Sequence, residues 1–350
     1  MVCKVKREKN YNLEVLRVVS CIMVVVIHVA NYYSRGYGLG EVNNASYIFS
    51  IICNVGSRIA VPIFFMISGS LLVDETLLIK KSLRRVGNTL WSLVVWSVIY
   101  CIWNYLYRDR VYDFRLIFAE PVKAHLWFLY AIIGMYLMLP FLQNMFKGMQ
   151  DILMRYFAAL WFLFLTIEYV FALCELPISY NIPLVGNSCY LGYFVLGYIV
   201  KGTIKKVPIS TKTCYVGAVL CLATVIIFTY ICTVLQGSHY DRLFQYRNIL
   251  IAIPSALIFY DALKNEHRPY KEKTKKMLSF LSRHSFNIYL CHVIFLDIVK
   301  LEFAPRSISA FIGIPLYTLF VFGCSLLFSV IWQFLCNKLK AIFANKEMAE

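Results

Sequence analysis

The chain has 350 residues, of which 60% are hydrophobic and 15% are charged, a composition typical of an integral membrane protein. Its formal net charge of +16 would suit a nucleic-acid partner, but the positions of the basic residues along the chain argue against that class. The length leaves no room for a second soluble domain of normal size. We therefore predict a single membrane domain over residues 1–350.

Apolar runs of about twenty residues recur along the sequence, and this is the length that an α-helix needs to cross a bilayer. They are not the ten-residue alternating segments of a β-barrel, so the predicted fold is an all-α polytopic transmembrane bundle. The sixth and eighth runs are weak or short, and nine or eleven spans also fit. The ten predicted spans are residues 13–33, 47–73, 87–107, 126–146, 156–173, 182–200, 214–235, 248–263, 285–301 and 311–336.

The basic residues are distributed unevenly between the two sides of this predicted bundle. With the N-terminus inside, the inner loops and tails carry 24 of the 35 Lys and Arg residues, and the outer loops carry 8. This bias follows the positive-inside rule and predicts that both termini are cytoplasmic. Most of the excess positive charge then serves to orient the protein in the membrane. Its partner is the lipid bilayer rather than nucleic acid. We expect a multi-pass protein of the cell membrane.

The first predicted span carries two ionisable side chains, Arg17 and His28, which are eleven residues apart. At about 100° per residue, this separation returns to within about 20° of the same helix face and rises about 16 Å. Glu14 and Cys21 share that face. Because intramembrane ionisable groups are costly and normally face a bundle interior or a water-filled cavity, the stripe predicts a polar track and a functional site.

Two further charged residues lie deep in predicted spans. Arg58 is about 16 Å from the outer end of the second span, and Glu168 is about 18 Å from the inner end of the fifth span. These depths overlap near the middle of the bilayer. Since unpaired charges are strongly disfavoured there, we predict that Arg58 and Glu168 are partners.

A basic cluster follows the second span, in the predicted inner loop 74–86. It consists of Lys80, Lys81, Arg84 and Arg85. One interpretation is a plain anchor that obeys the positive-inside rule. The other is a phosphate-binding patch, because guanidinium and ammonium groups both suit a polyanionic nucleotide tail.

Further candidates lie on the fourth and ninth spans. His125 and Trp127 are expected at the outer mouth, where a solvated histidine and an aromatic anchor are both common. His292 is expected about 10 Å from the cytoplasmic face, where a structural hydrogen bond would account for it. For Ser68 and Gly69 we favour helix packing, because small residues let helices approach closely.

Five segments in this order resemble the integral-membrane acyltransferase-3 family, whose members are inner-membrane O-acyltransferases acting on surface glycans and related acceptors. The resemblance covers about residues 10 to 336. The segments are Leu16-Arg17 with His28, the stretch Arg58–Gly69, the stretch Lys81–Arg85, the stretch His125–Tyr130 with Tyr136 and Pro140, and the stretch Ser285–His292.

The resemblance implies an acyl-CoA donor used from the cytoplasm and an acceptor hydroxyl presented at or beyond the membrane. The essential first-helix residues of the family correspond to Arg17 and His28, and its arginine pair corresponds to Arg84 and Arg85. Many polysaccharide acetyltransferases of the family have a Glu-rich segment where this chain has the apolar residues 131–134. The acceptor class is therefore left open between a glycan and another, lipid-linked acceptor.

Acyl transfer from a thioester to a hydroxyl needs a base, a group that stabilises the oxyanion and an anchor for CoA. We predict His28 as the general base, with a covalent acyl-histidine as the alternative role. Arg17 would orient the donor, expected to be acetyl-CoA, and Lys81, Arg84 and Arg85 would bind its phosphates. No metal is expected, since the cysteines show no metal-ligand spacing. The predicted acceptor-binding residues are Arg58, His125, Trp127 and Glu168.

A transporter or exporter is the alternative function. In that case the polar track from Arg17 to His28 would conduct a proton or a solute without acyl transfer. Transport in proteoliposomes without acyl-CoA would favour it, whereas acyl-CoA turnover that depends on His28 would favour the enzyme.

Overall fold

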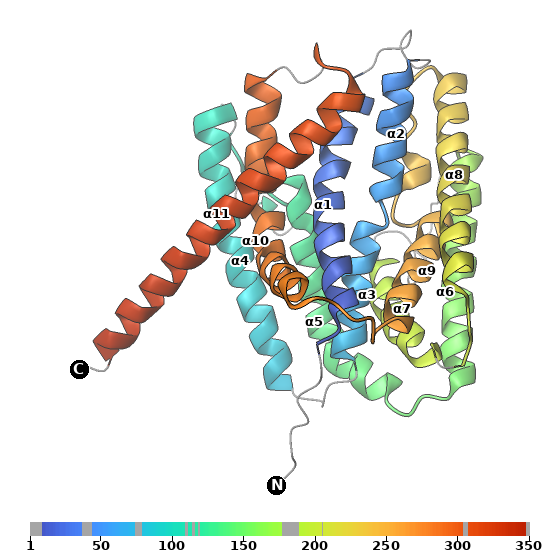
Figure 1. The fold of residues 1–350 in the computed structure, drawn as a ribbon, viewed down its shortest axis with the longest axis horizontal. Coiled ribbons are helices and arrows are strands. Elements are labelled where there is room, and N and C mark those ends of the chain that lie inside the picture. The colour runs from blue at the N-terminus through green and yellow to red at the C-terminus, as the bar shows by residue number, and fades with distance from the viewer. Residues whose placement is uncertain are drawn as a thin grey trace.

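The described part of the molecule is a bundle of α-helices, which confirms the predicted fold class (Figure 1). The computed structural model describes residues 9–36, 44–73, 79–108, 111–113, 116–117, 120–176, 189–204, 206–303 and 307–347. In chain order the helices are α1 (Tyr11–Ser34), α2 (Ala45–Ser57), α3 (Ala60–Leu72), α4 (Ile79–Arg108), α5 (Trp127–Phe146), α6 (Asp151–Leu173), α7 (Cys189–Thr203), α8 (Thr211–Gln236), α9 (Ile249–Lys264), α10 (Glu272–Glu302) and α11 (Ala310–Glu347). Short 3₁₀ turns, η3 (Ala124–Leu126) and η5 (Arg242–Phe244), precede α5 and α9.

Nine segments of the described residues are long and apolar enough to cross a membrane. They correspond to nine of the ten predicted spans. The tenth, residues 182–200, is represented by α7, which has only 15 described residues, and residues 182–188 lie outside the described part. Tyr193, Phe194 and Gly197 of α7 are all buried, so neighbouring helices enclose it. A helix that is covered in this way does not need the length of a lipid-facing span.

The second predicted span is interrupted between α2 and α3 at Arg58. Pro62 causes the break, because it lacks the N–H that would bond the carbonyl of Arg58. The Arg58 N–H bonds the Val55 carbonyl, three residues back rather than four, at 3.0 Å. Arg58 and Ile59 keep helical backbone angles, so the interruption is a local break in the hydrogen-bond ladder at a charged residue.

Helices α3 and α7 pack with their backbones in close contact. A Cβ atom on Gly69 would lie 1.7 Å from the Phe194 carbonyl oxygen, and one on Gly197 would lie 2.1 Å from that of Met66. The interpretation of Gly69 as a helix-packing residue is therefore confirmed. The hydroxyl of Ser68 bonds the Phe64 carbonyl of its own helix at 3.0 Å.

Helix α1 lies near the middle of the bundle beside α10, and the two pair through residues at a nearly constant sequence offset (Figure 1). Arg17 donates to the Ser282 hydroxyl at 3.1 Å, and the Cys21 thiol donates to the Ser285 carbonyl at 3.5 Å. Seven residues, or two helical turns, further along, the rings of His28 and His292 meet. The constant offset means that α1 and α10 run parallel, so the polar stripe of α1 faces α10 along its length.

Candidate active site

A cavity of about 700 Å³ opens beside the second half of α1, and we call it the His28 pocket. Helices α1, α3, α5 and α7 and the segment around η5 contribute to its wall. Its lining residues are Val24, Ile27, His28, Asn31, Arg35, Arg58, Val61, Ala124, His125, Trp127, Ala131, Tyr190, Asp241, Gln245, Tyr246 and Tyr289. Three of the predicted acceptor residues, Arg58, His125 and Trp127, therefore share a cavity with the predicted base.

One wall of the His28 pocket is aromatic. The ring of Trp127 lies 4.6 Å from that of Tyr190 and 6.0 Å from that of Tyr246, measured between centroids. These side chains come from the start of α5, the start of α7 and the segment after η5. An aromatic wall of this kind can pack against the apolar C–H face of a ring such as that of a sugar.

Arg58 is held in this pocket without the partner predicted for it. Its Nε donates to Asn54 Oδ1 at 3.0 Å, and its guanidinium lies 4.8 Å from the ring centre of Phe244 and 5.6 Å from that of Tyr246. Glu168 is buried on α6 and does not line the pocket. The predicted pairing of Arg58 with Glu168 is wrong, because Asn54, one helical turn earlier, and two aromatic faces hold the guanidinium instead.

The rim of the His28 pocket carries polar side chains that the sequence did not single out. Arg35 and Asp241 form an ion pair at 2.5 Å, and Asn31 and Gln245 lie nearby on the wall. Asn31 lies in the last turn of α1, and Arg35, Asp241 and Gln245 cap helix ends, where polar residues are common. Nothing in their sequence pattern separates them from ordinary loop residues.

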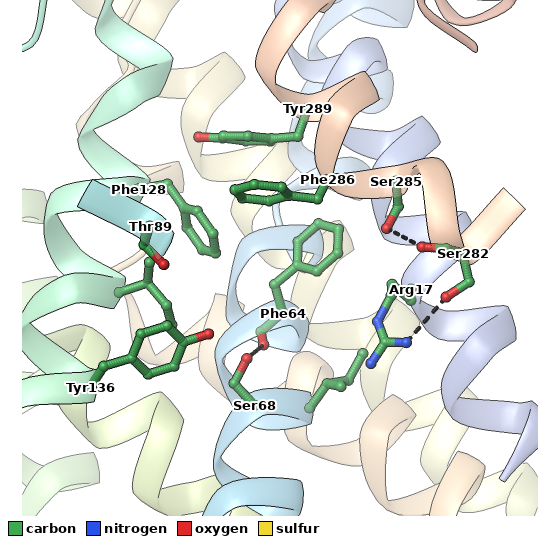
Figure 2. A pocket seen from close by; sticks show the side chains of 12 residues that line it. Arg17, Phe64, Ser68, Thr89, Phe128, Tyr136, Ser282, Ser285, Phe286 and Tyr289 are labelled. Atoms are coloured by element: carbon green, nitrogen blue, oxygen red, sulfur yellow. Dashed lines mark hydrogen bonds between the residues drawn. The ribbon is translucent and has the colours of Figure 1, made fainter. Parts of the chain in front are cut away.

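A second cavity of about 290 Å³, the Arg17 pocket, lies further toward the start of α1 (Figure 2). Arg17 lies at one end and Tyr289 at the other, with Phe64, Phe128 and Phe286 between them (Figure 2). The remaining lining residues are Ile67, Ser68, Thr89, Ile132, Tyr136, Ser282 and Ser285. The cavity is therefore largely aromatic, with a cation and hydroxyl groups at its Arg17 end.

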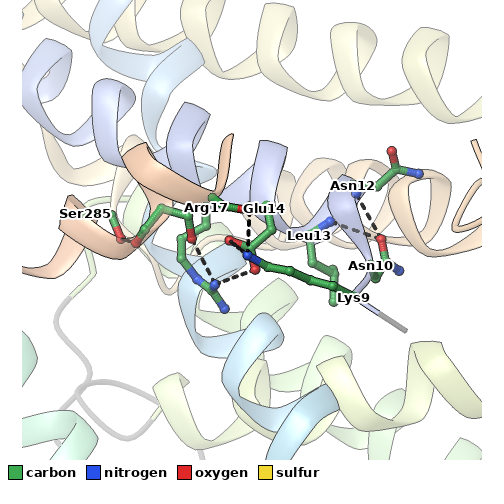
Figure 3. A network of polar contacts seen from close by, with 9 residues as sticks. Lys9, Asn10, Asn12, Leu13, Glu14, Arg17 and Ser285 are labelled. Carbon is green, nitrogen blue, oxygen red and sulfur yellow. Dashed lines mark hydrogen bonds and ion pairs between the residues drawn. The ribbon is translucent and has the colours of Figure 1, made fainter. Parts of the chain in front are cut away.

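Arg17 is oriented by neighbours on both α1 and α10 (Figure 3). One guanidinium nitrogen donates to Glu14 Oε1 at 3.0 Å and to Ser282 Oγ at 3.1 Å. Arg17 also lines a cavity of about 660 Å³ that includes Lys9 and Lys201. The guanidinium thus stands between the Arg17 pocket and a cavity of mixed charge, lined also by Glu14 and Glu266, at the end of the bundle where α1 begins.

The basic cluster after the second span lies on the first turns of α4, and not in a loop as predicted. Lys81 and Arg84 are exposed, Arg85 is half-buried, and residues 74–78 lie outside the described part. None of the three lines the cavities above. The Arg85 carbonyl accepts a hydrogen bond from the Thr89 hydroxyl at 3.0 Å, however, and Thr89 lines the Arg17 pocket. Arg85 is therefore one helical turn from that pocket, and Lys81 is two turns from it.

Three histidine rings meet at the inner wall of the His28 pocket. The ring of His292 lies 5.1 Å from that of His28 and 5.1 Å from that of His125. His125 is buried, with 3% of its surface exposed, and its Nε2 lies 3.2 Å from the Leu290 carbonyl. The prediction of a solvated His125 at the mouth is wrong, because η3 turns the side chain inward. Within the described residues, no group of His, Cys, Asp and Glu side chains has the arrangement of a metal site.

The predicted depth of His292 is also wrong. Helix α10 begins at Glu272 rather than near residue 285, so His292 lies about 30 Å along it. This length brings His292 level with His28.

Tyr289 lines both pockets and separates them. Its hydroxyl donates to the backbone carbonyl of His125, and its ring packs 5.3 Å from Phe128. One aromatic side chain therefore stands between the cavity that contains Arg17 and the cavity that contains His28.

Comparison with known proteins assigns the chain to a family. The acyltransferase domain family, acyltransferase 3, matches residues 10–332, nearly the whole chain. The chain belongs to the acyltransferase 3 family. No curated protein and no solved structure matches the chain. This acyltransferase is therefore a multi-pass membrane enzyme that transfers acyl groups, as the resemblance implied.

The matched region contains every side chain of the two pockets. In this acyltransferase the described site offers an imidazole, a guanidinium and an aromatic wall around the same cavity. Such groups can remove a proton, stabilise an oxyanion and hold an acceptor.

Proposed function

We propose that this acyltransferase moves an acetyl group from cytoplasmic acetyl-CoA to a hydroxyl of a surface glycan or a related acceptor. The observation that carries this proposal is the pair of pockets that meet at Tyr289, one containing Arg17 and the other containing His28. Two substrates could approach the same tyrosine from opposite ends of the bundle. We place the enzyme in the cell membrane with the Arg17 end toward the cytoplasm.

The Arg17 pocket suits the donor. A cavity of about 290 Å³ accommodates a short acyl group and part of a thiol arm. Arg17 would hold the arm of CoA, while Lys81, Arg84 and Arg85, one to two helical turns from the pocket along α4, would bind the CoA phosphates. The exposure of Lys81 and Arg84 supports this role, because a large hydrophilic nucleotide would remain at the surface.

The His28 pocket suits the acceptor. Trp127, Tyr190 and Tyr246 would stack against a sugar ring, and Arg58 would hydrogen-bond its oxygen substituents. Asn31 and Gln245 offer both donors and acceptors to further hydroxyl groups. His125 would complete the wall beside the reacting hydroxyl, whereas Glu168 would act only from outside this lining.

His28 would act as the general base. It removes the proton of the acceptor hydroxyl while the oxygen attacks the thioester carbonyl, and a C–O bond forms. When the tetrahedral intermediate collapses, the C–S bond breaks and the proton passes from His28 to the CoA thiolate. Arg17 lies about 16 Å along α1 from His28, so the negative charge on the carbonyl oxygen would be stabilised by a donor of the His28 pocket, such as Arg58.

Purified protein in lipid nanodiscs, assayed with radiolabelled acetyl-CoA and defined glycan acceptors, tests the proposal. His28→Ala should reduce acetyl transfer by about 10²–10⁴-fold, the usual contribution of a positioned base. His28→Gln should be almost equally inactive, because an amide accepts no proton near neutral pH. Both variants should retain the folding stability of the wild type within about 1–2 kcal/mol.

Two results would contradict the proposal. Near-normal turnover by His28→Gln would remove His28 as the base. Solute movement in proteoliposomes that needs no acyl-CoA, together with an absence of acetyl transfer, would instead support the transporter alternative.

A further inference from the structure

We propose that His292 is the positioning residue of His28. The Nε2 atom of His292 accepts the ring proton of His28 and so directs the other nitrogen of His28 into the pocket. This inference rests on the proposed role of His28 as base and extends it to a residue on another helix.

The first step concerns the protonation of His292. Its ring is 0% exposed, and Nδ1 lies 2.6 Å from the Tyr289 carbonyl oxygen. Since a carbonyl only accepts hydrogen bonds, Nδ1 carries the proton, and Nε2 of the neutral ring holds a lone pair. Within the described residues, Nε2 is buried without a hydrogen-bond partner. A buried acceptor left in that condition costs free energy, so a nearby donor is strongly favoured.

The second step identifies the donor. His125 cannot supply it, because its Nε2 already donates to the Leu290 carbonyl and its Nδ1 is another buried acceptor without a partner. His28 is the remaining ring beside His292. Its centroid is 5.1 Å away at a tilt of 46°, a separation that can bring facing nitrogens to about 3 Å. Because His292 Nε2 has no partner among the described residues as the two rings stand, the proposed hydrogen bond forms on rotation of the half-buried His28 ring.

The third step concerns how firmly His292 is held. The carbonyl that fixes it belongs to Tyr289, and Tyr289 is itself fixed through its hydroxyl to the His125 backbone. The parallel pairing of α1 and α10, seen at Arg17 with Ser282, sets the register of the two histidines. His28 would therefore donate its hydrogen bond to an acceptor whose tautomer and position are set before any substrate binds.

This arrangement has a chemical consequence. When one nitrogen of His28 is bonded to His292, only the other can take the hydroxyl proton, and it faces the acceptor. The imidazolium that forms keeps a charge-assisted hydrogen bond to a neutral, buried partner. Without His292 the base would rotate among several orientations, most of them unproductive.

Steady-state kinetics of three variants in nanodiscs test this inference. His292→Ala should lower kcat by about 10²-fold, with the KM for acetyl-CoA nearly unchanged, because the base is misoriented while donor binding persists. His292→Gln should recover at least about tenfold of that loss, since its amide oxygen can accept the His28 proton. The matched control is His284→Gln on the same helix, where Nδ1 contacts the Ser329 hydroxyl at 2.9 Å away from both pockets. This control should have the kcat of the wild type.

A second measurement is independent of turnover. Nitrogen NMR of ¹⁵N-histidine-labelled protein, assigned by comparison with His28→Gln, should show His28 as one tautomer in the wild type and as a mixture in His292→Ala. Unchanged kcat in His292→Ala, or an unchanged His28 tautomer, overturns the inference. If His28→Ala is inactive while His292→Ala is fully active, only this inference fails. If the wild type transfers no acetyl group, the proposed function fails, and the tautomer result still decides the hydrogen bond.

Discussion

The buried histidines of this bundle differ in what holds their rings. His125 and His292 each use one nitrogen on a backbone carbonyl, and His284 and His239 each use one on a hydroxyl. His28, by contrast, has a ring contact with His292 and faces a cavity of about 700 Å³. His125 lines the same cavity, but one of its nitrogens is bonded to the backbone. The cavity-facing ring of His28 is not committed to the fold in that way, whereas each of the other four rings has one nitrogen bonded within the fold. This difference separates His28 from the others at the level of single residues.

We expect the protonation of His239 to make the free energy of unfolding depend on pH. It lies between α8 and η5, outside the spans, and burial lowers its pKa to about 4, against an opposing effect of Asp241. In the unfolded chain this histidine has its ordinary pKa of 6.5, so between pH 4 and 6.5 the unfolded chain binds more protons than the folded chain. The stabilising contribution is complete above about pH 6.5 and is lost as the pH falls toward 4.

Thermal unfolding in detergent should thus show a Tm that decreases between pH 6.5 and 4. His239→Gln keeps a polar group beside the Tyr47 hydroxyl but does not titrate, so its Tm should change less over the same interval. Parallel curves for the two proteins would contradict this assignment.

Two features of single elements decide the shape of the site. The break between α2 and α3 places Arg58 in the His28 pocket, and the glycine contacts between α3 and α7 bring Tyr190 to the same wall. Both features arise from residues without functional groups, Pro62 and the glycines. Local backbone chemistry therefore positions the aromatic wall.

Gly197→Ala should destabilise the protein by about 1–3 kcal/mol, because its Cβ would overlap the Met66 carbonyl of α3. The matched control is Gly202→Ala on the same helix, where an added Cβ meets nothing within 4 Å. Thermal unfolding of both variants measures the effect. Equal Tm values for the two variants would show that α3 and α7 are not packed as closely as described.

The start of α4 carries a prediction about the donor. Replacing Arg84 and Arg85 together with Ala should raise the KM for acetyl-CoA about tenfold or more, because charge-assisted contacts of roughly 1.5–3 kcal/mol are lost. Steady-state kinetics at varied acetyl-CoA concentration measure this change. A KM that stays constant while the membrane topology is scrambled would identify the cluster as an anchor.

At the scale of the whole molecule, helix α1 begins and α11 ends at the same end of the bundle (Figure 1). Together with the bias of 24 to 8 in basic residues, this arrangement supports both termini in the cytoplasm. The short α7 would then complete the return between α6 and α8.

A reporter that works only in the cytoplasm should be active when it is fused after Glu350. A reporter that works only outside the cytoplasm should be inactive at the same position. A matched fusion after Arg35, which follows α1, should be active only as an extracytoplasmic reporter. If the reporter after Glu350 is active only outside the cytoplasm, the number of crossings is odd and this topology is wrong.

The sequence alone was sufficient for those features that depend on neighbours along the chain. Apolar run lengths determined the helical membrane fold, and helical periodicity determined that Arg17 and His28 share one face of α1. The packing role of Gly69 also followed, since a small residue in a span has few other uses. The ordered segments further indicated the family that the comparison then established.

Only the tertiary structure decided the contacts between distant residues. His292 meets His28 across 264 positions, Arg58 is held by Asn54 and Phe244 rather than Glu168, and Tyr289 divides the two pockets. Helical periodicity sets which face a side chain occupies, but the pairing of helices depends on packing among all of them. A proline break and an extension of α10 by thirteen residues shift the register of whole elements. Depth along one predicted span therefore could not place a residue against its partner on another helix.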